Sequence, residues 1–225
     1  MNILSLEHLT HSYTERKLFD DADFYLHEGD KVGVIGINGT GKSTLLKIMA
    51  GLETPDEGQV IQASNLMIHY LPQNPEFSEE DTVLQSVQNM VHHHANENEL
   101  IAAKAMLTRL GITDFEQKTR ELSGGQRKRL ALVSVLITPC DVLILDEPTN
   151  HLDSEMADWL ENKLQAFRGA LVMVTHDRYF LDSVTNKIIE LDKGKIYSYD
   201  EKYSGFLQRK AEREESVRAS ERKRQ

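Results

Sequence analysis

The chain has 225 residues, 40% of them hydrophobic and 28% charged, which is ordinary for a globular protein with one substantial domain. Its net charge of −10 argues against a surface that coats nucleic acid. The sequence lacks a secretory signal and an apolar run of membrane-span length, and its single cysteine, Cys140, cannot form an internal disulfide, so we expect a cytoplasmic protein with no membrane segment of its own.

The first predicted elements are strands. Residues 2–26 alternate in the manner of short strands, and KVGVIG, at 31–36, has the apolar pattern of a buried strand that leads into a glycine-rich turn. A helix is expected over 42–50, closed by Gly51, because glycine favours helix C-termini. Further strands are predicted within 59–71.

The middle of the chain changes character. Residues 82–120 lack strand runs and carry apolar residues at helical spacing, which predicts a helical subdomain, and another helix is expected over 123–137. The later predicted elements are a strand at 142–146, a helix near 155–167, a strand at 170–175, a short helix from 178, and strands near 187–191 and 195–199. Strands that alternate with helices indicate a largely parallel, covered sheet.

The C-terminal segment, 206–225, differs from the rest of the chain. It has almost no apolar residues and carries charges of both signs. As a helix it would extend about 30 Å with little surface to bury. Two interpretations remain open: a disordered tail, or the beginning of a helical connector to a further domain.

A phosphate-binding loop is indicated by GINGTGKS, Gly36–Ser43, which matches G-x-x-x-x-G-K-[ST] between a predicted strand and a predicted helix. Glycines let the backbone wrap around phosphate oxygens, Lys42 supplies a cation for the β- and γ-phosphates, and the Ser43 hydroxyl can ligate Mg²⁺. The candidate ATP-binding residues here are Gly36, Asn38, Gly39, Thr40, Gly41, Lys42, Ser43 and Thr44. The simpler alternative is a glycine-rich turn with a chance lysine.

The segment DVLILDEP supplies candidate acidic groups. Asp146 ends the predicted buried strand at 142–146, where a carboxylate can hold Mg²⁺ or its water. Glu147, next to it, is placed to act as general base on the attacking water. An acidic turn after a strand is the alternative.

Further segments in the same order resemble the nucleotide-binding domain of ABC ATPases, over Ile3 to about Tyr199. The matching residues are Tyr13, Gln73 in YLPQNP, Ser123, Gly124, Gly125 and Gln126 in LSGGQ, Asp153 in TNHLD, and His176 in VTHD. The resemblance implies an α/β P-loop NTPase fold with a mostly parallel core sheet, an N-terminal antiparallel β subdomain and a helical subdomain at about 76–138. It also implies an ATPase with ATP and Mg²⁺ as cofactors.

The resemblance assigns roles to the single residues. Tyr13 would stack on adenine. Gln73 would be a ligand of Mg²⁺ and would sense both that ion and the γ-phosphate. His176 would hold the γ-phosphate and the catalytic water. Each also has a simpler interpretation: a surface strand residue, a polar loop residue and a core histidine. The consecutive His92, His93 and His94 point in different directions on a helix, which favours a solvated helix end over a metal site.

The LSGGQ segment is implied to act in trans. In ABC domains this signature loop covers the γ-phosphate held by a second domain, head to tail, through the Ser123 hydroxyl and the N–H groups of Gly124 and Gly125. The chain would therefore carry two incomplete half-sites, and its partner would be a second ABC domain or a second copy of the chain. Cations at 127–129 crowd this helix N-terminus, where they are disfavoured, so either an anion docking there would relieve the conflict or the side chains splay into solvent.

Two classes of ABC protein fit the sequence. THDRYFLD, TNHLD with His151, and YSGFLQRKAERE from Tyr203 resemble soluble ABC-F proteins, in which 1–203 would be the first ABC domain and 204–225 the start of a charged linker cut before a second domain. That implies a translation-associated or antibiotic-resistance role, with the ribosome or rRNA as a partner. Only 48 residues, at 74–121, separate Gln73 from the signature, so the ABC-F arm would be minimal. The alternatives are the ATP-binding motor of an ABC membrane transporter and a non-catalytic ATP-gated clamp.

Overall fold

The computed structural model describes residues 1–90 and 95–222. The strands are β1 (Asn2–Tyr13), β2 (Arg16–His27), β3 (Lys31–Ile35), β4 (Glu57–Gln62), β5 (Ile68–Leu71), β6 (Val142–Asp146), β7 (Ala170–Val174), β8 (Lys187–Asp192) and β9 (Lys195–Tyr199). The helices are α1 (Lys42–Met49), α2 (Val83–Met90), α3 (Glu97–Arg109), η1 (Thr119–Glu121), α4 (Gly124–Leu136), α5 (Ser154–Ala166), α6 (Arg178–Val184) and α7 (Tyr203–Arg222). The alternation of strands and helices predicted from 31–36 onward is confirmed, with most ends within one or two residues of those expected.

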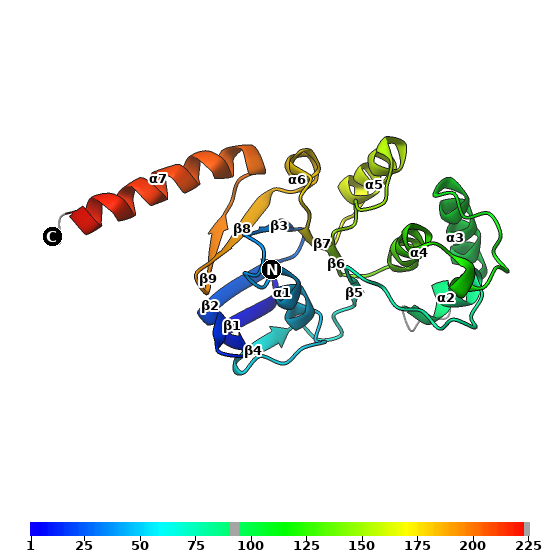
Figure 1. The fold of residues 1–225 in the computed structure, drawn as a ribbon, viewed down its shortest axis with the longest axis horizontal. Coiled ribbons are helices and arrows are strands. Elements are labelled where there is room, and N and C mark those ends of the chain that lie inside the picture. Colours follow the sequence, from blue (N-terminus) through cyan, green and yellow to red (C-terminus); the bar gives the residue numbers. More distant parts are fainter. Residues whose placement is uncertain (91–94, 223–225) are drawn as a thin grey trace.

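Two sheets form the framework of the molecule (Figure 1). The N-terminal sheet is antiparallel, in the order β2-β1-β4. The larger sheet has the order β5-β6-β7-β3-β8-β9, and every neighbouring pair in it is parallel except β8 with β9. The expected mostly parallel core sheet and antiparallel N-terminal subdomain are thus both confirmed.

The prediction of short strands in the N-terminal segment was wrong in one respect, because β1 and β2 are two long strands of 12 residues each. Their pairing slips between Leu6 and Leu9 and again before His11. At these irregularities His8 and Asp21 take left-handed backbone angles, with φ of 54° and 51°. Such bulges interrupt the two-residue alternation of side chains, so one long strand looks like several short ones in the sequence.

The central strands β6 and β7 of the larger sheet are buried on both faces, and the side chains of β6 alternate between two apolar clusters. Val142 and Ile144 pack into the cluster shared with α1 and the N-terminal sheet, whereas Leu143 and Leu145 pack into the cluster shared with α4, α5 and α6. A strand with apolar residues on both faces reads as an uninterrupted apolar run, which is why VLILD predicted a buried strand correctly.

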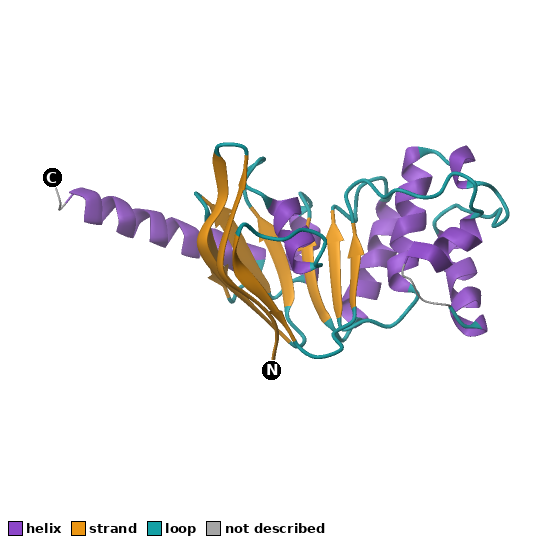
Figure 2. Ribbon diagram, turned by 90° about the horizontal axis from the view of Figure 1, so that it is seen from below, coloured by secondary structure: helices purple, strands orange, loops and turns teal. Residues whose placement is uncertain are grey.

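Helices α2, α3 and α4 lie together beyond the β5 edge of the larger sheet, at one end of the molecule (Figure 2). Leu107 on α3 and Leu130 on α4 are buried in the cluster that continues onto the sheet. Among the described residues, no helix is both long enough and apolar enough to span a lipid bilayer.

Over the described residues the C-terminal segment forms helix α7, so the disordered interpretation is wrong there, and a connection to a further domain stays a prediction. Figure 1 shows α7 leaving the body of the protein beside β8 and β9. Its first turns are attached: Phe206 is buried, and the buried carboxylate of Glu190 on β8 accepts from Lys210 at 2.5 Å and from Arg213 at 3.0 Å. These two cationic partners of one buried carboxylate explain why so polar a segment packs against the domain.

Candidate functional site

The topology of the larger sheet brings the predicted site residues together. The strands β5, β6, β7 and β3 are neighbours and parallel, so their carboxyl ends meet at one edge of the sheet. Gln73 follows β5, Asp146 ends β6, His176 follows β7, and the glycine loop follows β3. Open α/β sheets bind ligands in the crevice at this edge.

A pocket of about 370 Å³ lies there. It is lined by Tyr13, Leu18, Asn38, Gly39, Gly41, Lys42, Ser43, Thr44, Gln73, Asp146, Glu147, Val174 and His176. The structure therefore brings together, in one pocket, most of the residues expected to bind ATP and Mg²⁺ within a single domain. Seven predicted residues are not part of the lining: Gly36, Thr40, Ser123, Gly124, Gly125, Gln126 and Asp153.

The glycine loop ends in a helix N-terminus without a capping side chain. Gly41 is the N-cap residue of α1, with φ of 96°, and no side chain accepts from the first turn. By contrast, α4 and α5 are capped by Ser123 and Asp153. The free N–H groups of α1 and its positive dipole end can therefore meet an anion such as phosphate.

Lys42 provides the positive charge of this loop. Its Nζ donates to the carbonyl oxygens of Gly36 at 2.7 Å and Ile37 at 3.2 Å. Burial lowers the pKa of Lys42, while the neighbouring carboxylates of Glu147 and Asp146 act in the opposite direction. A partly buried ammonium held only by neutral carbonyls gains a stronger partner when a phosphate enters the pocket.

Asp146 is a buried carboxylate in need of a cation. It is 2% exposed, and neither of its oxygens makes a well-formed hydrogen bond among the described residues, although the Ser43 side chain lies close to it. Burial raises the pKa of Asp146, and Ser43, Lys47 and Lys42 partly offset this. The carboxylate, the Ser43 hydroxyl and the Gln73 amide are oxygen donors of the kind that Mg²⁺ prefers, so the residues present fit this ion.

The donor set also distinguishes between metals. In the part of the chain that the structure describes, no cluster of three or more His, Cys, Asp or Glu side chains is placed to hold a metal ion. Mg²⁺ is usually held by one or two carboxylates together with phosphate oxygens and water, which requires no such cluster. The histidines at 92–94 lie outside the described residues, so the expectation of a solvated helix end there stays a prediction.

Glu147 and His176 form a pair at the mouth of the pocket. The Glu147 Oε1 lies 3.1 Å from His176 Nε2, and the His176 N–H faces Glu147 Oε2 at 3.4 Å. Burial raises the pKa of Glu147, and the contacts with His176 lower it. The backbone of Glu147 is left-handed, with φ of 53°, and its N–H donates to Val174 on the adjacent strand. A non-glycine residue held in this conformation is typical of functional sites.

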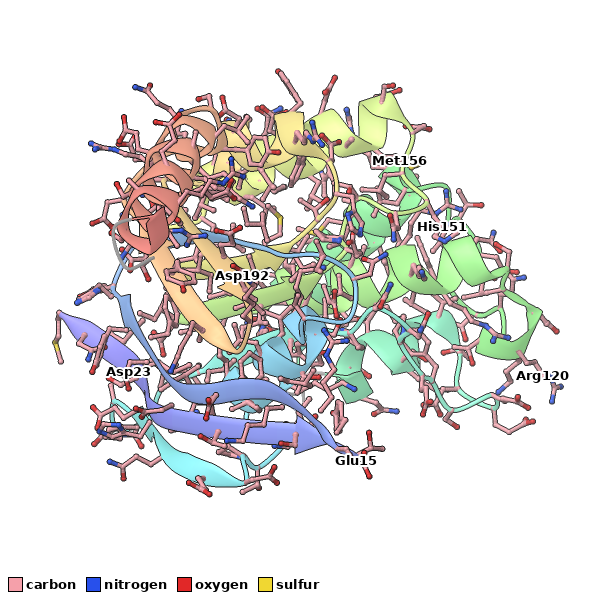
Figure 3. All side chains as sticks on the ribbon, turned by 60° about the vertical axis from the view of Figure 1, so that its left-hand side comes forward. Glu15, Asp23, Arg120, His151, Met156 and Asp192 are labelled. Carbon is pink, nitrogen blue, oxygen red and sulfur yellow. The ribbon has the colours of Figure 1, made fainter. Side chains whose placement is uncertain are left out.

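The signature segment lies elsewhere. Ser123 Oγ accepts from the Gln126 N–H at 3.1 Å, and the Gln126 side chain accepts from the Ser123 N–H, a reciprocal capping box at the start of α4. Among the described residues, no acceptor takes the Ser123 hydroxyl hydrogen, and nothing lies within 4 Å of the position that a Cβ on Gly124 would take. In Figure 3, His151, whose side chain lies 3.5 Å from the position that a Cβ on Gly125 would take, is well separated from Glu15 in the hairpin that follows Tyr13.

The expected relief of crowded cations by an anion is not needed for Arg127. Its guanidinium turns back to donate to the carbonyl oxygens of Thr119 at 3.2 Å and Arg120 at 3.3 Å, and so it supports η1. Arg129 reaches toward the Met156 sulfur at 3.8 Å. These basic side chains are used within the fold, which a count of charges along the sequence could not reveal.

Some pocket residues were missed by the sequence analysis. Leu18 and Val174 contribute apolar walls, and their strand positions gave no functional signal. Behind Tyr13, the side chains of His11 and Glu53 form a hydrogen-bonded cluster. The two-residue spacing of His11 and Tyr13 placed both on one strand face, but Glu53 lies far along the sequence in a turn and could be found only from the structure.

Comparisons with known proteins agree with this geometry. A family model described as ABC transporter matches residues 19–150. The chain is 40% identical to the ABC transporter ATP-binding protein YfmR of Bacillus subtilis (strain 168), with all of this chain and 42% of YfmR covered. It is 35% identical to the energy-dependent translational throttle protein EttA of Escherichia coli (strain K12), over 93% of this chain and 45% of EttA.

Solved structures share the fold. The ATP-binding cassette MJ0796, solved as a dimer bound to ADP and Pi, superposes with a TM-score of 0.74 at 23% identity, covering 88% of this chain and 98% of that one. The chain of a metal-chelate type ABC transporter in an inward-facing conformation gives 0.70 at 27% identity, covering 89% and 84%. The chain spans less than half the length of the curated relatives named above.

Proposed function

Because the chain belongs to the ABC transporter family, we propose that residues 1–203 bind Mg·ATP and hydrolyse it when a second ABC domain closes over the nucleotide. One observation carries this proposal: a single pocket gathers the glycine loop, Asp146, Glu147, His176, Gln73 and Tyr13, and leaves out the signature residues. A pocket of this composition can bind the triphosphate on one side and leaves its γ-phosphate to be covered by a partner.

The pocket residues divide the chemistry among them. The N–H groups of α1 and the Lys42 ammonium bind phosphate oxygens. Ser43, Asp146 and Gln73 would hold Mg²⁺, which neutralises phosphate charge when bound. The Glu147 carboxylate accepts a proton from water as the water oxygen bonds to the γ-phosphorus and the bond to the β–γ bridging oxygen breaks, which leaves ADP. His176 orients that water and the γ-phosphate by hydrogen bonds.

The signature residues complete the site of the partner on this proposal. Ser123, Gly124 and Gly125 offer a hydroxyl and backbone N–H groups at the N-terminus of α4, and Asp153 caps the neighbouring α5. An ATP-bound pair would be held together by the γ-phosphate and would separate after hydrolysis. The partner is a second ABC domain or a second copy of this chain.

We further propose a cytoplasmic role on the ribosome, of the ABC-F kind, over a role as a transporter motor. The likeness to a translational throttle protein supports it, and so does α7, which leaves the domain as a charged helix from Tyr203 onward, where the sequence resembles an ABC-F linker. Residues 204–225 would then begin the connection to a second domain.

Equilibrium binding of Mg·ATP tests the nucleotide proposal. Lys42→Ala should weaken binding about 10- to 100-fold, because hydrogen bonds to a charged group contribute about 1.5–3 kcal/mol. Lys163→Ala, on the exposed face of α5, is the matched control and should bind as the wild type does. Equal affinities for all three chains would contradict a phosphate site at Lys42.

Co-sedimentation separates the two biological roles. The intact protein carrying Glu147→Gln should pellet with purified ribosomes in Mg·ATP and stay in the supernatant without nucleotide. Binding to membrane vesicles that contain a partner subunit, with none to ribosomes, would favour the transporter motor instead.

A further inference from the structure

A hydrogen-bonded cluster holds Tyr13 at the pocket. The Tyr13 hydroxyl donates to Glu53 Oε1 at 2.5 Å, and His11 Nε2 lies 2.8 Å from the same oxygen. An ionised carboxylate only accepts, so His11 must donate from Nε2. The His11 and Tyr13 rings also meet edge to face, with centroids 5.3 Å apart.

The cluster restrains a ring that would otherwise be free. Tyr13 is 47% exposed and ends β1, next to a tight hairpin turn in which Thr14 is left-handed. An exposed aromatic side chain loses rotamer freedom when it stacks on a ligand, and this loss weakens binding. A tether that fixes the ring beforehand removes most of that cost.

Glu53 is well suited to be this tether. Burial raises its pKa, but the hydrogen bonds from Tyr13 and His11 outweigh burial and hold the pKa of Glu53 below its usual value. The carboxylate is therefore a constant acceptor. His11 behind it is nearly buried, so packing restrains its ring; among the described residues its Nδ1 makes no hydrogen bond and lies 3.6 Å from Asp56.

The tether also joins the two ends of the pocket. Glu53 lies in the loop directly after α1, the helix whose N-terminus faces the phosphate loop. Thr44, in the first turn of α1, also contacts the Tyr13 hydroxyl. The ring at one end of the pocket is thus attached to the element that carries Lys42 and Ser43 at the other.

We propose that Glu53, supported by His11, is a positioning residue that presents the Tyr13 ring to the base of a bound nucleoside triphosphate. This inference rests on the proposed function, in which Tyr13 meets adenine. Through this contact the chain distinguishes ATP from a bare triphosphate, although the phosphate-binding residues are the same for both ligands.

The test compares two ligands, ATP and inorganic tripolyphosphate, each with Mg²⁺, in equilibrium binding. Tyr13→Phe keeps the ring and removes the hydroxyl, whereas Glu53→Ala removes the acceptor. Each should weaken ATP binding about fivefold, as expected for the loss of one net hydrogen bond. The double variant should bind ATP about as tightly as whichever single variant has the lower affinity. Glu53→Gln, which keeps an acceptor oxygen, should bind ATP with nearly wild-type affinity. Tripolyphosphate affinity should not change in any of these chains.

Several results would overturn the inference. An equal loss for tripolyphosphate would mean that Glu53 only supports α1, and fully additive losses would mean that the two side chains act separately. If Tyr13→Phe bound ATP with wild-type affinity, the positioning role of Glu53 would be excluded, whereas the proposed ATPase function would be unaffected. A wild-type chain that binds ATP no more tightly than tripolyphosphate would exclude the base contact, and one that binds neither ligand would defeat the proposed function itself.

Discussion

Among single residues, Glu147 combines features that suit a general base. Its carboxylate is buried beside Asp146, Lys42 and His176, its backbone is left-handed, and its N–H donates to the Val174 carbonyl oxygen. This conformation turns the side chain of the residue after β6 into the pocket, where a regular strand would continue away from it. The position of Glu147 after VLILD was predictable, but its backbone angle was not, because it depends on contact with β7.

We predict that Glu147→Gln binds Mg·ATP about as well as the wild type but hydrolyses it about 10²- to 10⁴-fold more slowly, the usual contribution of a general base. Glutamine preserves the shape and loses only the ability to take a proton. Single-turnover hydrolysis and equilibrium binding measure the two effects. Glu155→Gln, on an exposed glutamate that pairs with Arg109, is the control, and unchanged hydrolysis in Glu147→Gln would refute the assigned role.

For whole elements, the attachment of α7 shows where sequence patterns stop being informative. The segment has no apolar stripe, so its periodicity left both disorder and helix open. The structure resolves this through groups outside the segment: the Asp182 carboxylate accepts from the Ser204 N–H at 2.8 Å, and Glu190 binds Lys210 and Arg213. These partners come from α6 and β8, and pairings between distant elements leave no mark in the local sequence.

The core elements were predictable for the opposite reason. Each strand of the larger sheet and each covering helix carries its own apolar pattern, as VLILD and the residues of α4 do. Such an element can therefore be recognised from its own residues, without information from distant segments. The same holds for the proposed phosphate loop, because its glycines, lysine and serine lie within one short segment of the sequence. The Tyr13–Glu53 contact, which joins β1 to a loop after α1, could not be predicted this way.

Replacement of the Glu190 anchor should loosen α7. Glu190→Gln leaves Lys210 and Arg213 with a neutral partner in a largely buried setting, and we expect a local loss of about 1–3 kcal/mol, seen as faster hydrogen–deuterium exchange in the first half of α7. Glu201→Gln is the matched control, since Glu201 pairs with Arg209 on the surface and should change exchange by less than about 1 kcal/mol. The same exchange rates in both variants would show that the buried pair is not what holds the helix.

At the scale of the whole molecule, the pocket and the signature segment lie on one chain but do not meet. The pocket contains the residues from β1, the glycine loop, β6 and β7, and excludes all four signature residues. If ATP completes a site between two copies, then hydrolysis per chain should rise with protein concentration. It should also depend on which halves are intact in each pair, and this second dependence gives the sharper test.

We predict that two inactive chains restore hydrolysis when mixed, provided that they are damaged in different halves. Lys42→Ala disables the phosphate-loop half. On the proposed function, Gly124→Asp places a carboxylate near the γ-phosphate of the partner, and among the described residues nothing lies within 4 Å of the Cβ that it adds. In an equal mixture half of the pairs are mixed, each with one sound site of two, so about a quarter of wild-type turnover should return. A mixture of Lys42→Ala with Glu147→Gln is the control and should stay inactive, since both changes damage the same half. Recovery in neither mixture, or brisk turnover by Gly124→Asp alone, would mean that each chain completes its own site.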